Sequence, residues 1–232
     1  MTGSDVTGRD SVTGEAAGAE SRVLLVDDHP IVRQGLRRLI SNEPGLAVCG
    51  EAESVREARQ AIRDQQPDVV VVDLSLKEGD GLELVKDVRA HHPGLPILVL
   101  SMYDESVFAA RLLAAGANGY IMKQAASDQF IAALRQVLAG RTYLSESASL
   151  GLIRKISPGS NRGGSPIDNL SNRELQVLQM IGKGMSSREM ADSLNLSIKT
   201  VEAHRQRIKR KLGLKTSAHL VQFAADWVAR RI

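Results

Sequence analysis

Five short apolar runs alternate with amphipathic stretches between residues 22 and 140, at positions 23–26, 46–48, 69–72, 97–100 and 119–122. Runs of this length suit strands that are buried on both faces, as in a parallel sheet with helices on either side. Helix signals fill the intervals: Pro30 precedes an apolar stripe, Ser54 with Glu57 forms a capping box, and Ser127 is placed to cap the last helix. The pattern predicts an α/β doubly wound, five-stranded parallel sheet.

Composition divides the 232 residues into four parts. Residues 1–20 carry four acidic residues and one basic residue without an apolar core, which favours a disordered leader over a signal peptide. Residues 21–140 hold the predicted sheet, and 169–232 form a small helical domain. The linker, 141–168, contains SPGSNRGGSP at 157–166, which is typical of a flexible tether. Residues 144–156 fit either a short helix or a frayed extension of the first domain.

Composition also excludes several classes of protein. No apolar run approaches the ~20 residues that span a bilayer. The single cysteine, Cys49, rules out a disulfide framework and fits a reducing cytosol, so we expect a cytoplasmic protein. The net charge of +3 conceals an asymmetry, because residues 165–232 carry twelve basic and six acidic residues. This asymmetry is typical of a sensor joined to a polyanion binder, although small basic domains can be merely soluble.

Polar residues follow the predicted strands where each strand ends: Asp27 and Asp28, then Asp73, Ser101 and Lys123. Carboxyl ends of parallel strands share one edge, so we expect these side chains to meet. Three adjacent carboxylates repel one another, and a hard cation such as Mg²⁺ relieves the repulsion. Lys123 offers a charge and Ser101 a hydroxyl to a phosphoryl group, and Asp73 is the predicted nucleophile that forms an acyl phosphate. The alternative is that Asp28 caps a helix and Ser101 is a plain loop residue.

Five motifs extend this pattern: VDDHPIVRQGL (26–36), VVVDL (70–74), GDGLEL (79–84), LVLSMYD (98–104) and GANGYIMK (116–123). With them, residues 22–140 resemble the flavodoxin-like receiver domain of two-component response regulators. The resemblance implies that a sensor histidine kinase phosphorylates Asp73, and that Ser75 and Tyr103 tune the lifetime of the phosphate. It implies a switch pair, Ser101 and Tyr120. The implied Mg²⁺ ligands are Asp27, Asp28, Asp73 and the backbone carbonyl of Ser75.

Two features limit the chemistry. Lys77 stands where this family usually has proline, which leaves the loop geometry and phosphate lifetime open. A rival class, phosphohydrolases of the haloacid dehalogenase type, needs a second acid two residues after the nucleophile. Ser75 occupies that position, so we expect no enzyme beyond phosphoryl acceptance and slow autodephosphorylation.

The C-terminal part has three helix starts with matching caps. Ser171 with Glu174 and Ser186 with Glu189 form capping boxes, and Ser197 caps a third helix over 198–212. The spacing suits a helix-turn-helix. The third helix carries six basic residues and one acid and is the predicted recognition helix. We assign to the major groove Glu202, Ala203 and Gln206, and to the DNA backbone Lys199, Thr200, His204, Arg207 and Arg210.

Residues 170–216 are similar to the LuxR-type helix-turn-helix, and the whole chain resembles response regulators of the NarL/FixJ class. This implies a DNA-binding transcription regulator that forms a homodimer on phosphorylation, with RNA polymerase as a further candidate partner. Our hypothesis is that the unphosphorylated receiver masks the recognition helix or keeps the chain monomeric. In the last helix, 217–228, Trp227 fits a dimer contact and core packing equally. A receiver that controls only a protein partner is the remaining alternative.

Overall fold

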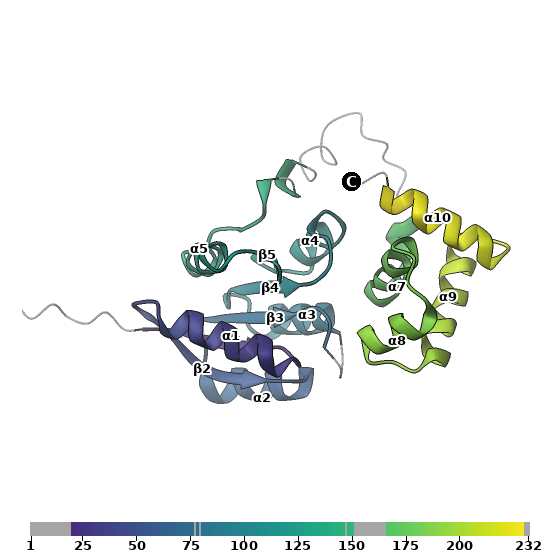
Figure 1. Ribbon diagram of the computed structural model, residues 1–232. Helices are drawn as coiled ribbons and strands as arrows, with labels where there is room; N and C mark the ends of the chain where they lie inside the picture. Colours follow the sequence, from purple (N-terminus) through teal and green to yellow (C-terminus); the bar gives the residue numbers. More distant parts are fainter. Residues whose placement is uncertain (1–19, 77, 79, 147, 151–165, 230–232) are drawn as a thin grey trace, which may run out of the picture.

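The computed structural model describes residues 20–76, 78, 80–146, 148–150 and 166–229. The predicted leader, apart from Glu20, lies outside the described residues, as do Lys77 and almost all of the predicted tether. Two domains are visible in Figure 1, an α/β domain and a smaller helical domain.

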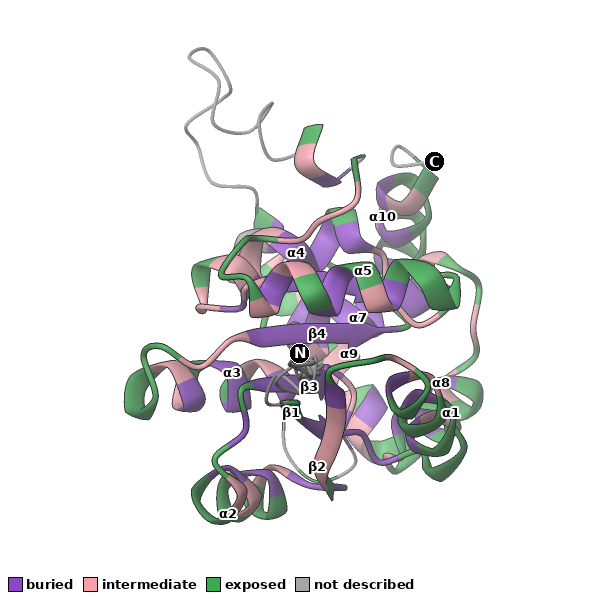
Figure 2. Ribbon diagram, turned by 90° about the vertical axis from the view of Figure 1, so that its left-hand side faces the viewer, coloured by how far each residue is buried: buried purple, intermediate pink, exposed green. Residues whose placement is uncertain are grey.

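The first domain is built on a five-stranded parallel sheet in the order β2-β1-β3-β4-β5, which confirms the predicted fold. The central strands are buried along their whole length, as the sequence runs predict (Figure 2). The strands are β1 (Ser21–Val26), β2 (Leu46–Ala52), β3 (Val69–Asp73), β4 (Ile97–Ser101) and β5 (Gly119–Met122).

Helices cover both faces of this sheet. Alternate strand residues face opposite ways, so Val23 and Leu25 pack with α1 and α5, whereas Leu24 and Val26 share a core with α2, α3 and α4. Two apolar layers therefore hold the sheet between them. The helices are α1 (Pro30–Ser41), α2 (Val55–Gln65), α3 (Gly81–His91), α4 (Glu105–Ala114) and α5 (Ser127–Leu138).

Two helix caps in this domain differ from the predictions. The Ser54 hydroxyl accepts the Glu57 N–H as expected, but the Glu57 carboxylate accepts the N–H of Glu53 instead of that of Ser54. Ser127 is the first residue of α5, one position too late to cap it, and Ala126 stands at the N-cap without a side-chain bond. The first turn of α5 therefore lacks the predicted cap.

The segment after α5 extends the sheet. Tyr143 forms a bridge with Gly119, and its backbone exchanges hydrogen bonds of 3.0 Å with Tyr120 and Asn118. Residues 146 and 148–150 are helical, and 151–156 lie outside the described residues. The start of the linker is thus attached to the edge of β5.

The second domain contains the predicted helix-turn-helix. Both capping boxes form, and Ser197 accepts the Thr200 N–H. Gly184 (φ 80°) and Asn195 (φ 50°) make the left-handed turns before and after α8. The elements are a short 3₁₀ turn (Pro166–Asn169), α7 (Asn172–Gly182), α8 (Ser187–Leu194), α9 (Ile198–Lys211) and α10 (Ser217–Ala229).

Trp227 is 8% exposed and belongs to the core of this domain with Leu220 and Ala224. Of its two predicted roles, the structure therefore favours core packing. Within the described part of the chain, no helix has both the length and the apolar character needed to cross a membrane.

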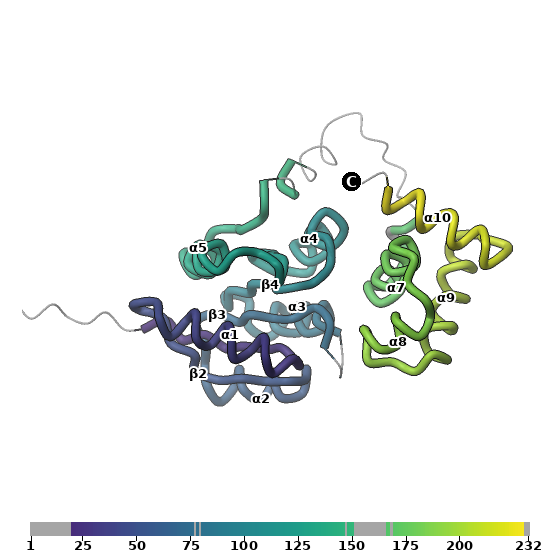
Figure 3. Tube along the Cα trace, in the orientation of Figure 1, coloured from purple at the N-terminus to yellow at the C-terminus, as the bar shows by residue number. Residues whose placement is uncertain are grey.

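The domains meet through α7, which is the helix of the second domain nearest α3 and α4 (Figures 1 and 3). The Arg111 guanidinium on α4 donates to the carbonyl oxygens of Leu170 at 2.6 Å and Ile167 at 2.7 Å, just ahead of α7. Polar side chains of α7, Gln176 and Gln179, are 2% and 4% exposed. Because even its polar residues are buried, α7 is enclosed on one side by its own domain and on the other by the α/β domain.

Candidate functional site

The three predicted carboxylates converge at the carboxyl edge of the sheet. Asp27 and Asp28 directly follow β1, Asp73 ends β3, and β1 pairs with β3 in the sheet. Each residue is at most 2% exposed. One oxygen from each lies within 4.8 Å of the others. The acids therefore meet at the shared edge of the sheet, as expected from their positions after the predicted strands.

Lys123 follows β5 and reaches across to these acids. Its Nζ lies 2.6 Å from Asp27 Oδ2 and 2.9 Å from Asp73 Oδ2, and its side chain is 7% exposed. Burial alone would lower the pKa of Lys123, but the charges of Asp73 and Asp27 outweigh burial and raise it. The ammonium is therefore held charged between two carboxylates.

Burial raises the pKa of Asp73 above its usual range, against the opposing effect of Lys123. The backbone N–H of Ser75 donates to Asp73 Oδ1 at 3.0 Å and fixes the carboxylate from the other side. Because α3 begins close by, a Cβ atom at Gly81 would lie 2.4 Å from the Asp73 carbonyl oxygen. The glycine of GDGLEL is thus required to close the loop beside the site.

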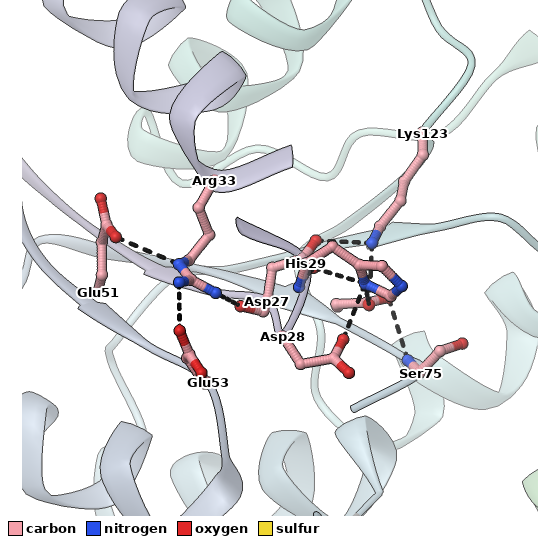
Figure 4. Close-up of polar contacts among 9 residues, drawn as sticks. Asp27, Asp28, His29, Arg33, Glu51, Glu53, Ser75 and Lys123 are labelled. Atoms are coloured by element: carbon pink, nitrogen blue, oxygen red, sulfur yellow. Dashed lines mark hydrogen bonds and ion pairs between the residues drawn. The ribbon is translucent and has the colours of Figure 1, made fainter. Parts of the chain in front are cut away.

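His29 is a member of the cluster that sequence reasoning missed. Its Nδ1 lies 2.8 Å from Asp28 Oδ1, 3.0 Å from Asp27 Oδ1 and 3.8 Å from Asp73 Oδ2 (Figure 4). Its position directly after the two acids was the available signal. The side chain is 47% exposed, in contrast to the buried acids.

Arg33, one turn into α1, is a second missed residue. Its guanidinium donates to the Asp27 carbonyl at 2.5 Å and to Glu51 Oε2 at 3.2 Å, and it also pairs with Glu53 (Figure 4). It is 8% exposed. Arg33 therefore anchors the β1–α1 loop that carries two of the acids. A charged residue at an inward position of α1 was the signal in the sequence.

The donor set suits a hard divalent cation. Asp27, Asp28 and Asp73 contribute carboxylate oxygens, which Mg²⁺ prefers, and their mutual repulsion in a buried position favours a bound cation. The residues present therefore fit Mg²⁺, the metal expected from the sequence.

The predicted switch residues lie on the next two strands of the sheet, because Ser101 ends β4 and Tyr120 is in β5. Ser101 is fully buried, and its Oγ accepts the Tyr103 N–H at 3.1 Å. The Tyr120 hydroxyl donates to the Tyr103 carbonyl at 2.8 Å, and burial raises the pKa of Tyr120. The Tyr103 backbone therefore joins the two residues of the predicted pair.

The second candidate site is the outward face of α9. Val201 and Ile208 are buried against the domain, while most of the predicted contact residues are exposed. The exposed residues are Lys199, Glu202, Gln206, Arg207 and Arg210, and Ala203 is half-buried among them. The exposed Glu202 carboxylate also interacts with side chains of its own domain: it accepts a hydrogen bond from Ser187 Oγ at 2.5 Å and lies 3.5 Å from Arg205 Nε.

Two of the residues predicted to contact the DNA backbone lie beside this face and are half-buried. Thr200 is half-buried in the first turn of α9, with its hydroxyl 2.8 Å from that of Ser197. His204 is on the inward stripe one turn after Val201, and its Nδ1 is buried. The 3.6-residue period of the helix places both positions off the centre of the outward face.

The placement of His204 predicts a pH effect. Burial, then the charges of Arg207 and Arg173, lower the pKa of His204. The unfolded chain, with a histidine pKa near ~6.5, takes up this proton first, so stability falls as the pH drops below that value. We expect His204→Gln to flatten this part of a plot of melting temperature against pH. An unchanged slope between wild type and variant would contradict the assignment.

A cleft of about 670 Å³ separates the acidic site from the second domain. It is lined by Asp73, Lys123 and His29 on one side and by residues such as Gln179 and Lys183 of α7 and the following turn on the other. The masked part of the helical domain is therefore α7, and the outward face of α9 is open. Of the two forms of the hypothesis, masking of the recognition helix is not seen in this structure, and a monomeric unphosphorylated chain stays a prediction.

Comparison with known proteins identifies both domains. Residues 23–135 match the response regulator receiver domain, and residues 168–224 match the luxR family of bacterial regulatory proteins. The oxygen regulatory protein NreC of Staphylococcus carnosus is 36% identical over 208 residues, which cover 88% of this chain and 96% of NreC.

Solved structures agree. A LuxR-family two-component response regulator from Aurantimonas sp. SI85-9A1 is 38% identical and aligns with a TM-score of 0.56 over 59% of this chain and 98% of its own. RcsB of Salmonella enterica serovar Typhimurium, bound to promoter rprA in the presence of phosphomimetic BeF3⁻, is 29% identical, with a TM-score of 0.59 over 89% of this chain and 98% of its own. The chain therefore belongs to the two-component transcriptional response regulators that join a receiver domain to a LuxR-type helix-turn-helix domain.

Proposed function

We propose that Asp73 accepts a phosphoryl group from a sensor histidine kinase and that this modification controls binding of duplex DNA by α9. The observation that carries the proposal is the convergence of three buried carboxylates with Lys123, in the same chain as an exposed basic helix. The proposed protein must reach both its kinase and DNA, so we propose that it acts in the cytoplasm. The free Cys49 is in keeping with that reducing compartment.

In the transfer, a carboxylate oxygen of Asp73 bonds to phosphorus while the bond from phosphorus to the donor histidine breaks and the imidazole departs. Lys123 lies beside Asp73 and balances charge on the phosphoryl oxygens. Asp27, Asp28, Asp73 and the Ser75 carbonyl would hold Mg²⁺, which when bound neutralises the acids and orients the phosphoryl group. Slow hydrolysis by water returns Asp73 to its free carboxylate.

The switch starts from the bonds around Tyr103. We infer that the Ser101 hydroxyl turns from the Tyr103 N–H toward a phosphoryl oxygen. The Tyr103 backbone then shifts, and the Tyr120 hydroxyl loses its hydrogen bond to the Tyr103 carbonyl oxygen. Tyr103 lies in the loop before α4, and α4 carries the Arg111 bonds to the start of α7. A change at Asp73 thereby reaches the contact between the domains.

Once α7 is released, two chains are free to pair on DNA. The RcsB structures include two dimers bound to two parallel DNAs, and we propose a phosphorylation-dependent homodimer for this chain as well. The exposed Lys199, Arg207 and Arg210 contact phosphates, while Gln206 and Ala203 face the bases. RNA polymerase is a further proposed partner of the DNA-bound form.

Intact-mass measurement tests the proposal. The purified chain, incubated with acetyl phosphate and Mg²⁺, should gain one phosphoryl group, and peptide mapping should place it on Asp73. The Asp73→Asn variant should gain none, because an amide cannot form the acyl phosphate. A phosphoryl group on another residue, or equal DNA affinity before and after modification, would refute the proposal.

Arg111 provides a separate prediction about docking. Arg111→Ala removes two charge-assisted hydrogen bonds at 2.6 and 2.7 Å, so we expect the equilibrium for docking of the helical domain to fall at least about tenfold. The radius of gyration from small-angle X-ray scattering should then increase. Arg59→Ala, which removes an exposed ion pair with Asp87, is the matched control and should leave the radius unchanged.

A further inference from the structure

The ring of His29 lies where the three acids point. Its Nδ1 is at hydrogen-bond distance from Asp28 Oδ1 and from Asp27 Oδ1, and 3.8 Å from Asp73 Oδ2. These are the residues that we assign to Mg²⁺. A cation bound by the three carboxylates would need the same oxygen atoms that the His29 ring nitrogen now contacts.

Mg²⁺ does not favour a nitrogen ligand here. It prefers oxygen donors in a near-octahedral shell and retains several waters, whereas imidazole suits zinc, copper, iron and nickel. Three carboxylates and water already satisfy the oxygen preference. The ring therefore has no place in the shell of a bound Mg²⁺.

His29 is also the one group of this cluster that has room to leave. The side chains of the three acids and of Lys123 are at most 7% exposed, whereas that of His29 is 47% exposed. His29 stands at the N-cap of α1 without using its side chain as a cap, and Pro30 fixes the backbone after it. Rotation of the side chain alone moves the ring into the cleft of about 670 Å³ that it already lines.

We propose that His29 competes with the divalent cation for the carboxylate oxygens. In the metal-free protein its ring contacts these oxygens, and the ring must rotate into the cleft before the metal binds. Its backbone N–H, which donates to Asp27 Oδ1 at 2.8 Å, stays in place and keeps that carboxylate oriented. His29 thus sets the metal affinity of the site without being a ligand. The inference rests on the proposed Mg²⁺ site.

The test measures metal binding directly. Mn²⁺ shares the oxygen preference of Mg²⁺ and its free form is counted by electron paramagnetic resonance; calorimetry gives the Mg²⁺ affinity of the same samples. Because the ring no longer competes, His29→Ala should bind both ions about tenfold more tightly than wild type. His91→Ala is the matched control, since His91 is 70% exposed and lies outside the acidic cluster, with its Nδ1 2.9 Å from the Asp87 carbonyl oxygen and 3.5 Å from Asp87 Oδ1.

Each outcome is decisive. Weaker Mn²⁺ and Mg²⁺ binding by His29→Ala would make the ring a ligand and overturn the inference, as would unchanged binding. If neither wild type nor His29→Ala binds either ion, the proposed metal site itself fails. Nuclear magnetic resonance of the wild-type chain gives a second readout that needs no variant. As Mg²⁺ is added, the chemical shifts of the His29 ring should move toward those of a solvent-exposed histidine, while those of His91 stay unchanged.

Discussion

Lys123→Met should destabilise the metal-free receiver domain by about 3 kcal/mol, because it leaves buried carboxylates without their cationic partner. Lys123 Nζ is 2.6 Å from Asp27 and 2.9 Å from Asp73, and all three side chains are nearly inaccessible to solvent. Methionine fills a similar volume but carries no charge, so the change isolates the electrostatic contribution. Urea unfolding followed by circular dichroism in the presence of a chelator measures the difference.

Two further measurements separate charge from packing. Adding Mg²⁺ should restore part of the lost stability, since the cation binds only the folded acids. Combining Lys123→Met with Asp73→Asn should cost less than the two single changes predict, because one of the unpaired charges is gone. A Lys123→Met variant that is as stable as wild type in the chelator would show that the carboxylates are relieved in another way.

Lys86→Met is the control for this series. Lys86 pairs with Glu83 at 2.8 Å, but both side chains are more than half exposed, at 53% and 62%. Exposed pairs of this kind contribute little, so we expect a change of less than about 0.5 kcal/mol. The contrast between the two lysines tests whether burial of the pair, and not pairing alone, makes the free energy of unfolding sensitive to loss of the lysine charge.

The sheet and the acidic site were predictable because both follow from local patterns. Runs such as 69–72 are long enough for one buried strand and too short for a helix, and the acids follow those runs directly. The shared edge of parallel strands was enough to predict that Asp27 and Asp73 meet, and the structure adds that their strands, β1 and β3, are direct neighbours. The helix caps at Ser171, Ser186 and Ser197 are equally local, and each formed as predicted.

Other features depend on groups that are far apart in the chain. Arg33 reaches Glu51 and the Asp27 carbonyl, and no periodicity in α1 specifies those partners. The contact of Arg111 with the carbonyls before α7 joins two domains across the linker, so it was invisible to a pattern within either one. For the same reason the sequence could not indicate that α7, and not the recognition helix, lies against the receiver domain.

The exposed face of α9 carries the second large prediction. Lys199→Ala combined with Arg207→Ala removes two basic side chains from this face, which the receiver leaves uncovered. Each phosphate contact contributes about 0.9 to the slope of log affinity against log salt, so the slope should fall by about 1.8. At 0.1 M salt this corresponds to a loss of about 60-fold in affinity. Titration of a promoter duplex, recovered by genomic footprinting with the wild-type chain, measures both quantities.

Matched variants decide what the loss means. Arg38→Ala with Lys86→Ala removes the same charge from exposed receiver positions and should leave the salt slope unchanged, which excludes an effect of net charge alone. Gln206→Ala should instead reduce discrimination between sequences by roughly 1–3 kcal/mol while retaining the slope, because a base contact releases no counterion. A DNA-reading helix cannot lose two phosphate contacts without a change in salt dependence. If the double change on α9 leaves DNA affinity and its salt slope unchanged, α9 is not the DNA-binding element and the receiver instead controls a contact with another protein.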